Sequence, residues 1–129
     1  MTDRPEGASL AITFLYYRDL PGAVRFYEDV MGLTLAIDQE WSKIYRICPN
    51  AHIGLVDEEH GMHKSEPKKP VQICLRVPDV DAWYAWAEAQ GVPNLSKMFE
   101  SAHLGIRAFV FEDPEGHQIE IQTPTRDGA

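Results

Sequence analysis

YRDLPGAVRFYEDVMGL, residues 17–33, carries the signals of one complete helix. Asp19 is a residue type that caps helix starts, and Pro21 suits the first turn because its missing N–H costs nothing there. Gly32 can end the helix in the left-handed conformation. The stretch therefore predicts a helix from about residue 20 to residue 31.

The same signals return in the second half of the chain, in VPDVDAWYAWAEAQGV, residues 77–92. Asp79 stands 60 residues after the first capping aspartate, and Gly91 stands 59 residues after the first stop glycine. This stretch predicts a second helix near residues 79–90. A repeat of this length indicates an internal duplication in which each copy is a whole supersecondary module.

Runs rich in β-branched and aromatic residues surround both predicted helices and are typical of strands. In the first half these runs cover residues 9–17, 33–37, 42–48 and 51–57. In the second half they cover residues 71–77, 94–101, 104–112 and 117–122. Each half therefore has the order β-α-β-β-β.

We expect a single domain over residues 1–129, with a first module at about 9–57 and a second at about 70–123. The segment between them, EEHGMHKSEPKK at residues 58–69, has no apolar periodicity and mixes both charge signs, which predicts a long loop. A chain of this length can bury a core without disulfides or a structural metal.

Composition narrows the class of partner. The formal net charge is −8, so the chain offers little to neutralise a row of phosphates, and a nucleic-acid partner is not expected. No apolar run approaches the ~18 residues of a membrane span, and the polar N-terminus lacks a signal-peptide core. Cys48 and Cys74 lie in apolar runs and are expected to be reduced core thiols, so we expect a cytoplasmic protein.

Two modules of this kind, together with RDLPGAVRFYEDVMGLTL at 18–35 and FEDPEGHQIEI at 111–121, resemble the vicinal-oxygen-chelate superfamily. That superfamily includes glyoxalases, bleomycin-resistance proteins, fosfomycin-resistance enzymes and extradiol dioxygenases. The resemblance covers about residues 9–123. It implies an α+β fold in which two βαβββ modules form a cup-shaped mixed eight-stranded sheet, with helices outside and a ligand cavity inside, usually within a homodimer.

The resemblance also implies where a divalent metal would be held. The four matching positions are Ile12, Gly54, Gln72 and Glu120, and the first two offer no ligand atom. A catalytic metal generally needs about three protein ligands, so no cofactor is expected and the inherited site is interpreted as degraded. If a divalent metal does bind, Gln72, Glu120 and His52 are the expected ligands, although His52 would need a shift of about 6–7 Å along its strand.

Glu120 is the leading candidate for a functional side chain. Gln118, Glu120 and Gln122 alternate with Ile119 and Ile121, so the three polar residues share one strand face. That face lines either a cavity or the solvent, and the resemblance places residue 120 inward. Glu120 is therefore expected to contact a substrate or to act as a catalytic base.

Other polar candidates lie in the second half. Gln72 and Arg76 share a face in an otherwise apolar run and are expected to bind substrate, or else Arg76 forms an ion pair with Glu120. His103 and Arg107 flank a turn that in similar proteins lies near the cavity mouth. His103 is thus a candidate base and Arg107 a candidate substrate contact, with an exposed turn histidine as the alternative for His103.

Aromatic residues supply the apolar part of the predicted site. Tyr16 stands in phase with Phe14, and Trp41 precedes an inner strand, so Tyr16 and Trp41 are expected to stack on a planar ligand. Trp83 and Trp86 lie on the second helix and indicate packing or dimer contacts.

Three functions are compatible with this pattern. The first, which we favour, is a metal-independent binder of a small aromatic or cationic molecule, as in bleomycin-resistance proteins. The second is a metal-dependent lyase, isomerase or dioxygenase that uses Glu120, Gln72 and a borrowed histidine. The third is a metal-free enzyme in which Glu120 or His103 takes a proton. The expected partners are a small-molecule ligand and a second copy of the chain.

Overall fold

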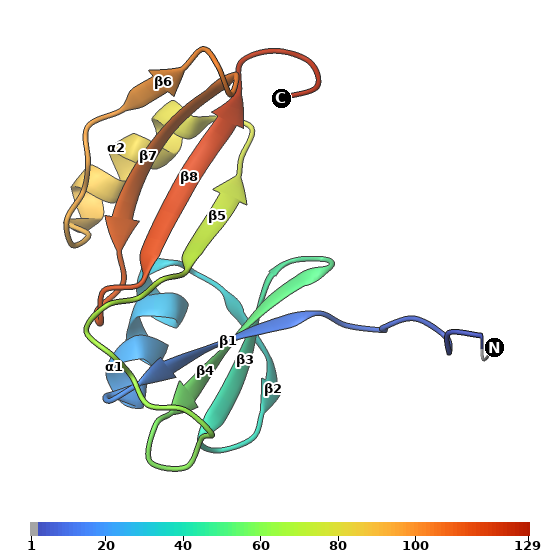
Figure 1. The fold of residues 1–129 in the computed structure, drawn as a ribbon. Helices are drawn as coiled ribbons and strands as arrows, with labels where there is room; N and C mark the ends of the chain where they lie inside the picture. The colour runs from blue at the N-terminus through green and yellow to red at the C-terminus, as the bar shows by residue number, and fades with distance from the viewer. Residues whose placement is uncertain (1–2) are drawn as a thin grey trace. The chain divides into compact units, whose positions relative to one another are not determined.

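The structure is a computed structural model that describes residues 3–129, and it divides the chain into two compact units, up to Ser65 and from Glu66 onward. The first unit contains β1 (Ile12–Tyr17), α1 (Leu20–Arg25), a π-helical segment η1 (Phe26–Val30), β2 (Thr34–Asp38), β3 (Ser42–Cys48) and β4 (Ala51–Asp57). The second contains β5 (Gln72–Arg76), α2 (Val80–Gln90), β6 (Phe99–Ser101), β7 (Ile106–Glu112) and β8 (Gln118–Pro124). Each unit is thus a βαβββ module, and the fold class is α+β (Figure 1).

The first helix begins and ends where its sequence signals predict. Oδ1 of Asp19 accepts a hydrogen bond from the N–H of Gly22 at 3.1 Å, and Gly32 adopts a φ of 69°. The second half of the helix differs from a regular α-helix, because the N–H of Met31 donates to the carbonyl of Phe26 at 2.9 Å, five residues back.

The first unit forms a four-stranded sheet in the order β1-β4-β3-β2, with β1 parallel to β4. One face packs against α1 and η1 and supplies core residues such as Leu15, Tyr45 and Leu55. The hydroxyl of Tyr45 donates to Glu28 of η1 at 2.9 Å. Burial, reinforced by this bond, raises the pKa of Tyr45 well above its usual value.

The second unit repeats this arrangement in the order β5-β8-β7-β6, with β5 parallel to β8. Helix α2 lies against one face of the sheet (Figure 1), where Tyr84 meets Phe109 with ring centroids 5.0 Å apart. Asp79 caps α2 by accepting the N–H of Ala82 at 3.1 Å, and Gly91 ends it with a φ of 65°.

The acidic turn between β7 and β8 has a structural role. The carboxylate of Asp113 is buried and accepts hydrogen bonds from the backbone N–H groups of Glu115 and His117, each at 3.0 Å. Its second oxygen lies 3.0 Å from Nδ1 of His117. The turn thus satisfies its own polar groups, which explains this part of the motif without a ligand.

Three sequence predictions need correction. Cys48 and Cys74 are free, as predicted, but both are exposed and neither is a core residue. The runs predicted to begin at residues 9 and 94 form shorter strands, β1 and β6. Before β6, Asn94 adopts a left-handed φ of 51°, which a strand cannot accommodate. Among residues 3–129, no helix is long and apolar enough to cross a bilayer.

Candidate functional site

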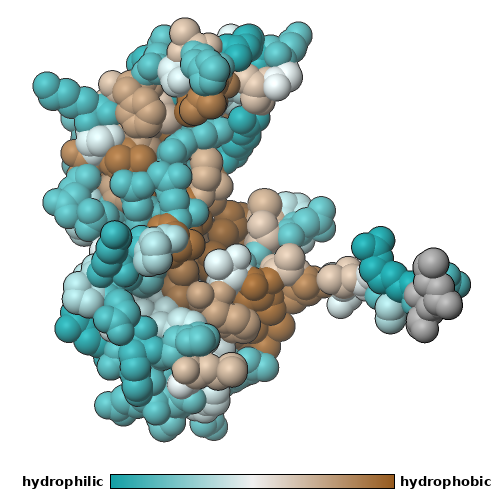
Figure 2. All heavy atoms as spheres, in the orientation of Figure 1, coloured by the Kyte–Doolittle hydropathy of each residue, from teal (hydrophilic) through white to brown (hydrophobic). Residues whose placement is uncertain are grey.

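The face of the first sheet that α1 leaves uncovered exposes large apolar side chains. Phe14 is 44% exposed and Trp41 is 42% exposed, whereas Leu15, on the covered face, is buried. Figure 2 shows hydrophobic side chains at the surface of this unit around β1, where Leu10 is also exposed. Exposed aromatic clusters on a soluble protein commonly mark binding surfaces.

A pocket of about 250 Å³ lies on this face, and we call it the aromatic pocket. It is lined by Phe14, Tyr16, Gln39, Trp41, Ser42, Val56, Gly61 and Met62. The structure therefore brings together Tyr16 and Trp41, the two residues that the sequence singled out for stacking. It adds Phe14, which lies on β1 two residues before Tyr16.

The loop after β4 forms one wall of the aromatic pocket, which the sequence did not indicate. Gly61 approaches the sheet so closely that an added Cβ would lie 2.7 Å from ring carbon Cε2 of Tyr16 and 2.7 Å from Cγ1 of Val56. His63 then packs edge-on against Tyr16, with ring centroids 5.2 Å apart. A glycine within a polar loop was the only signal of this contact.

Trp41 is held by the tight connection between β2 and β3. Glu40 has a φ of 65°, and its N–H donates to Oδ1 of Asp38 at 3.0 Å. The carbonyl of Trp41 accepts the N–H of Asp57 at 2.8 Å. A non-glycine residue in the left-handed region is uncommon, and here it positions the indole ring beside the pocket.

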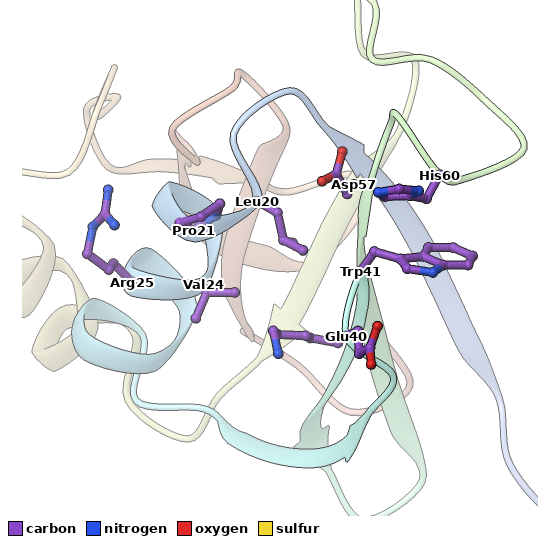
Figure 3. Close-up of a pocket in the computed structure, with 9 residues that line it drawn as sticks. Leu20, Pro21, Val24, Arg25, Glu40, Trp41, Asp57 and His60 are labelled. Atoms are coloured by element: carbon purple, nitrogen blue, oxygen red, sulfur yellow. The ribbon is translucent and has the colours of Figure 1, made fainter.

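Trp41 also borders a second pocket on the helix-covered side of the same sheet, of about 600 Å³, which we call the α1 pocket. Figure 3 shows the residues that line it. They are Leu20, Pro21, Val24, Arg25, Glu40, Trp41, Lys43, Asp57 and His60.

The predicted metal positions of the first unit carry an apolar contact. The ring of Phe14 lies over Gly54, where any added Cβ would collide with it. Ile12 pairs in register with His52, not with Gly54. His52 is buried, and its Nδ1 has no hydrogen-bond partner among residues 3–129.

In the second unit, the uncovered face is a ladder of polar pairs between β5 and β8. Three pairs face one another: Gln72 donates to Gln118 at 2.6 Å, Cys74 to Glu120 at 3.7 Å, and Arg76 to Gln122 at 2.7 Å. Gln122 in turn donates to Glu120, which is half-buried. Glu120 is thus connected to Arg76 through Gln122.

His103 and Arg107 lie apart from this ladder. Arg107 belongs to the helix-covered face and forms ion pairs with Asp81 of α2 at 2.7 Å and with Glu100 at 3.2 Å. His103 is exposed in the turn before β7, and its carbonyl accepts a hydrogen bond from Arg126 at 3.0 Å.

A separate group of metal-ligating residue types lies at the end of β4. Single ligand atoms of Asp57, Glu59 and His60 come within 4.8 Å of one another. The group is largely exposed, and Oδ1 of Asp57 already accepts the N–H of Glu59 at 2.9 Å. Asp57 and His60 also line the α1 pocket.

Solved structures with this fold are numerous. A lactoylglutathione lyase from Agrobacterium tumefaciens is 22% identical, with a TM-score of 0.74, over 98% of this chain and 100% of that one. A glyoxalase/bleomycin resistance protein/dioxygenase from Nocardioides is 20% identical, with a TM-score of 0.76, over 99% and 89%. A fosfomycin resistance protein from Listeria monocytogenes is 16% identical, with a TM-score of 0.73, over 93% and 96%.

These likenesses show the fold. No curated protein sequence matches the chain significantly. The family model of the Glyoxalase/Bleomycin resistance protein/Dioxygenase superfamily, however, matches residues 9–121, which is nearly the whole chain. With its two βαβββ modules, the chain therefore belongs to the glyoxalase/bleomycin resistance protein/dioxygenase superfamily.

Proposed function

We propose that the protein binds a small planar organic molecule in the aromatic pocket and does so without a resident metal ion. The observation that carries the proposal is the convergence of Phe14, Tyr16 and Trp41 on one hollow of an uncovered sheet face. Aromatic rings offer a planar ligand apolar area and stacking, at about 0.5–1.5 kcal/mol per pair beyond burial. The names of two similar structures refer to small organic molecules, which supports a small organic ligand, while its planarity rests on the aromatic pocket alone.

The volume of the aromatic pocket and the net charge of the protein narrow the class of ligand further. A pocket of about 250 Å³ is slightly smaller than the ~300–1,000 Å³ of most ligand sites, which favours a single ring or a fused pair of rings. The net charge of −8 disfavours polyanions and leaves neutral and cationic molecules.

The donor atoms present do not fit a tightly held metal. In the first unit, Ile12 has no ligand atom, and the space beside Gly54 is filled by Phe14. In the second unit, Gln72 and Glu120 share a face, but one amide and one carboxylate fall short of the three ligands that a catalytic ion requires. These residues therefore do not support a metal-dependent reaction step.

We also propose that polar residues of the second unit contact a ligand or accept a proton. Glu120 is the group best suited to hold a polar atom of a ligand or to accept a proton, because it is half-buried and fixed by two neighbours. His103, Arg76 and Gln72 are secondary candidates, and Arg107 is the weakest because two carboxylates occupy it. A homodimer in the cytoplasm belongs to the same proposal and rests on family membership and composition.

The aromatic pocket can be tested with 2-naphthol and its saturated, non-planar analogue decahydro-2-naphthol. Titrations followed by amide NMR shifts should give binding of 2-naphthol with shifts at Tyr16 and Met62, and weaker binding of the saturated compound. Tyr16→Ala and Trp41→Ala should each weaken binding about two- to tenfold.

Phe99→Ala is the matched control, since Phe99 is an aromatic residue of similar exposure, 42%, in the second unit. This variant should bind 2-naphthol as the parent does. Equal affinity for the planar and saturated compounds, or unchanged affinity in both pocket variants, would refute the proposal.

A further inference from the structure

We propose that the α1 pocket is a separate binding site for a small organic cation that carries an apolar group, such as an arylalkyl amine. The site goes beyond the function proposed above, because it lies on the helix-covered side of the first sheet while the aromatic pocket lies on the uncovered side. One wall of the α1 pocket is apolar, and the opposite wall combines aromatic rings with carboxylates.

One wall is apolar and rigid. Leu20, Pro21 and Val24 project from α1, as Figure 3 shows. Leu20 is buried at the base of this wall, and the helix is fixed by the cap at Asp19. An aryl or alkyl group placed against this wall would remove apolar area from water on both partners, at roughly 25 cal/mol per Å².

The other wall combines aromatic rings with carboxylates. The rings of Trp41 and His60 lie 5.8 Å apart with a tilt of 34°. Glu40 and Asp57 lie near these rings (Figure 3). An indole is the best partner for a cation held over a ring face, and adjacent carboxylates add direct attraction.

Among the lining residues that form no ion pair in the described part of the chain, negative charges outnumber positive ones. Lys43 is already neutralised by Asp38, at 2.8 Å, and this bond lowers the pKa of Asp38. Arg25 also lines the pocket and adds one positive charge against the two carboxylates, but it extends away from the indole in Figure 3. Neither Glu40 nor Asp57 belongs to an ion pair within residues 3–129. One oxygen of Asp57 accepts the N–H of Glu59 at 2.9 Å, which leaves its other oxygen and the carboxylate of Glu40 for a ligand.

This arrangement selects against the other common ligand classes. A carboxylate or phosphate would face the two carboxylates of Glu40 and Asp57 and a lysine paired with Asp38, and Arg25 would be the one lining cation outside an ion pair within residues 3–129. A bare ammonium ion or metal cation would leave the apolar wall uncovered. A ligand that unites one positive charge with an apolar body uses both walls.

The test is an amide NMR titration at pH 7 with four matched probes: 4-phenylbutylamine, 4-phenyl-1-butanol, 4-phenylbutyrate and butylamine. We expect 4-phenylbutylamine to shift Leu20, Val24 and the indole N–H of Trp41. It should bind at least tenfold more tightly than the alcohol and than butylamine, and the carboxylate should not bind.

Three variants examine the charge. Glu40→Gln and Asp57→Asn keep the shape of each side chain and should each weaken binding of the amine severalfold while leaving the alcohol unchanged. Asp38→Asn should also weaken the amine, because it releases the charge of Lys43. Glu88→Gln, an equal charge change at an exposed position of α2 outside the pocket, should have no effect.

The possible results distinguish this site from purely apolar binding, from binding of the cation alone and from binding in the aromatic pocket. Equal affinity for the amine and the alcohol would overturn the proposal, as would binding of butylamine as tight as that of 4-phenylbutylamine. Amine-induced shifts confined to Tyr16 and Met62 would overturn it as well, because they would assign the cation to the aromatic pocket. Should Asp57→Asn fail to fold, Glu40→Gln and the probe series still decide.

Discussion

The contact between Cys74 and Glu120 is the most chemically distinctive pair in the second unit. The thiol points at a carboxylate oxygen 3.7 Å away. Burial raises the pKa of Cys74, and the negative charge and hydrogen bond of Glu120 raise it further, while Arg76 acts in the opposite direction. The pair therefore keeps an exposed cysteine protonated and poorly nucleophilic at neutral pH.

Replacing Glu120 by Gln should make this thiol more reactive. The charge is lost while the shape stays, so the pKa of Cys74 should fall and more thiolate should be present at pH 8. In a Cys48→Ser background, we expect the rate of alkylation by iodoacetamide to rise severalfold. Glu112→Gln, on the adjacent strand β7, is the charge-matched control and should leave the rate unchanged.

The same pair has a consequence for stability, with a definite sign. The folded thiol holds its proton more tightly than the unfolded one, so ionisation above the ordinary thiol pKa of 9.0 favours the unfolded chain. Stability should therefore fall as the pH rises through this range, and less steeply in Glu120→Gln. Identical alkylation rates and identical alkaline profiles would mean that Glu120 does not act on Cys74.

At the residue scale, the sequence predicted which face of the second sheet each side chain occupies better than it predicted which side chains form hydrogen bonds with one another. The alternation around Glu120 correctly placed Ile119 and Ile121 in the core and Gln118 on the opposite face. The alternative of an ion pair between Arg76 and Glu120 did not anticipate that Gln122 would stand between them. Alternation fixes the face of a side chain, whereas its partner depends on register and rotamer.

At the element scale, the packing of β1 on β4 explains why a glycine occupies a predicted metal position. Phe14 and Gly54 are paired in register, and the ring covers the glycine. A larger side chain at residue 54 would displace the ring that forms part of the aromatic pocket. The glycine is thus a packing partner of Phe14.

Gly54→Ala should destabilise the protein by about 1–3 kcal/mol, the usual cost of overpacking a tight site. In a Phe14→Ala background the same substitution should cost close to nothing, because the obstructing ring is gone. Urea unfolding of the four proteins in this double-mutant cycle measures the coupling.

Gly7→Ala serves as the control for glycine replacement itself. Gly7 has no atom within 4 Å of an added Cβ, so its substitution should stay within about 0.5 kcal/mol of the parent. A cost for Gly54→Ala that persists without the Phe14 ring would show that the glycine is required for another reason.

The elements show where local signals suffice and where they fail. Caps and stop glycines predicted both helices, because these signals act within a few residues. The π-helical segment Phe26–Val30 and the approach of the loop at Gly61 to β1 were not predicted. The approach at Gly61 depends on contacts with Tyr16 and Val56, which local sequence signals do not report, and nothing in the structure explains the π-helical geometry.

At the scale of the whole molecule, the two units share one topology but differ in surface chemistry. Both sheets have the same strand order, with the first strand of each unit parallel to its last. The face that the helix leaves uncovered is apolar and aromatic in the first unit and a ladder of polar pairs in the second. The same topology thus carries two different surface chemistries.

This difference leads to a prediction about metal content. The apolar face lacks ligand atoms at Ile12 and Gly54, and the polar face offers only Gln72 and Glu120 at the matching positions. Protein purified without a chelator and without an affinity tag should hold well under one equivalent of transition metal by elemental analysis. Adding EDTA should leave the melting temperature almost unchanged, because the core of the described residues is built from apolar side chains that a chelator does not affect.

Variants can assign any metal that does appear. The exposed group of Asp57, Glu59 and His60 could take up added zinc or nickel weakly, and His60→Ala would abolish this binding. A full equivalent retained through purification, lost in His52→Ala and kept in His60→Ala, would contradict the prediction. Since His52 is buried with an unpartnered Nδ1, that result would mean that this imidazole had replaced the ligand missing at Ile12.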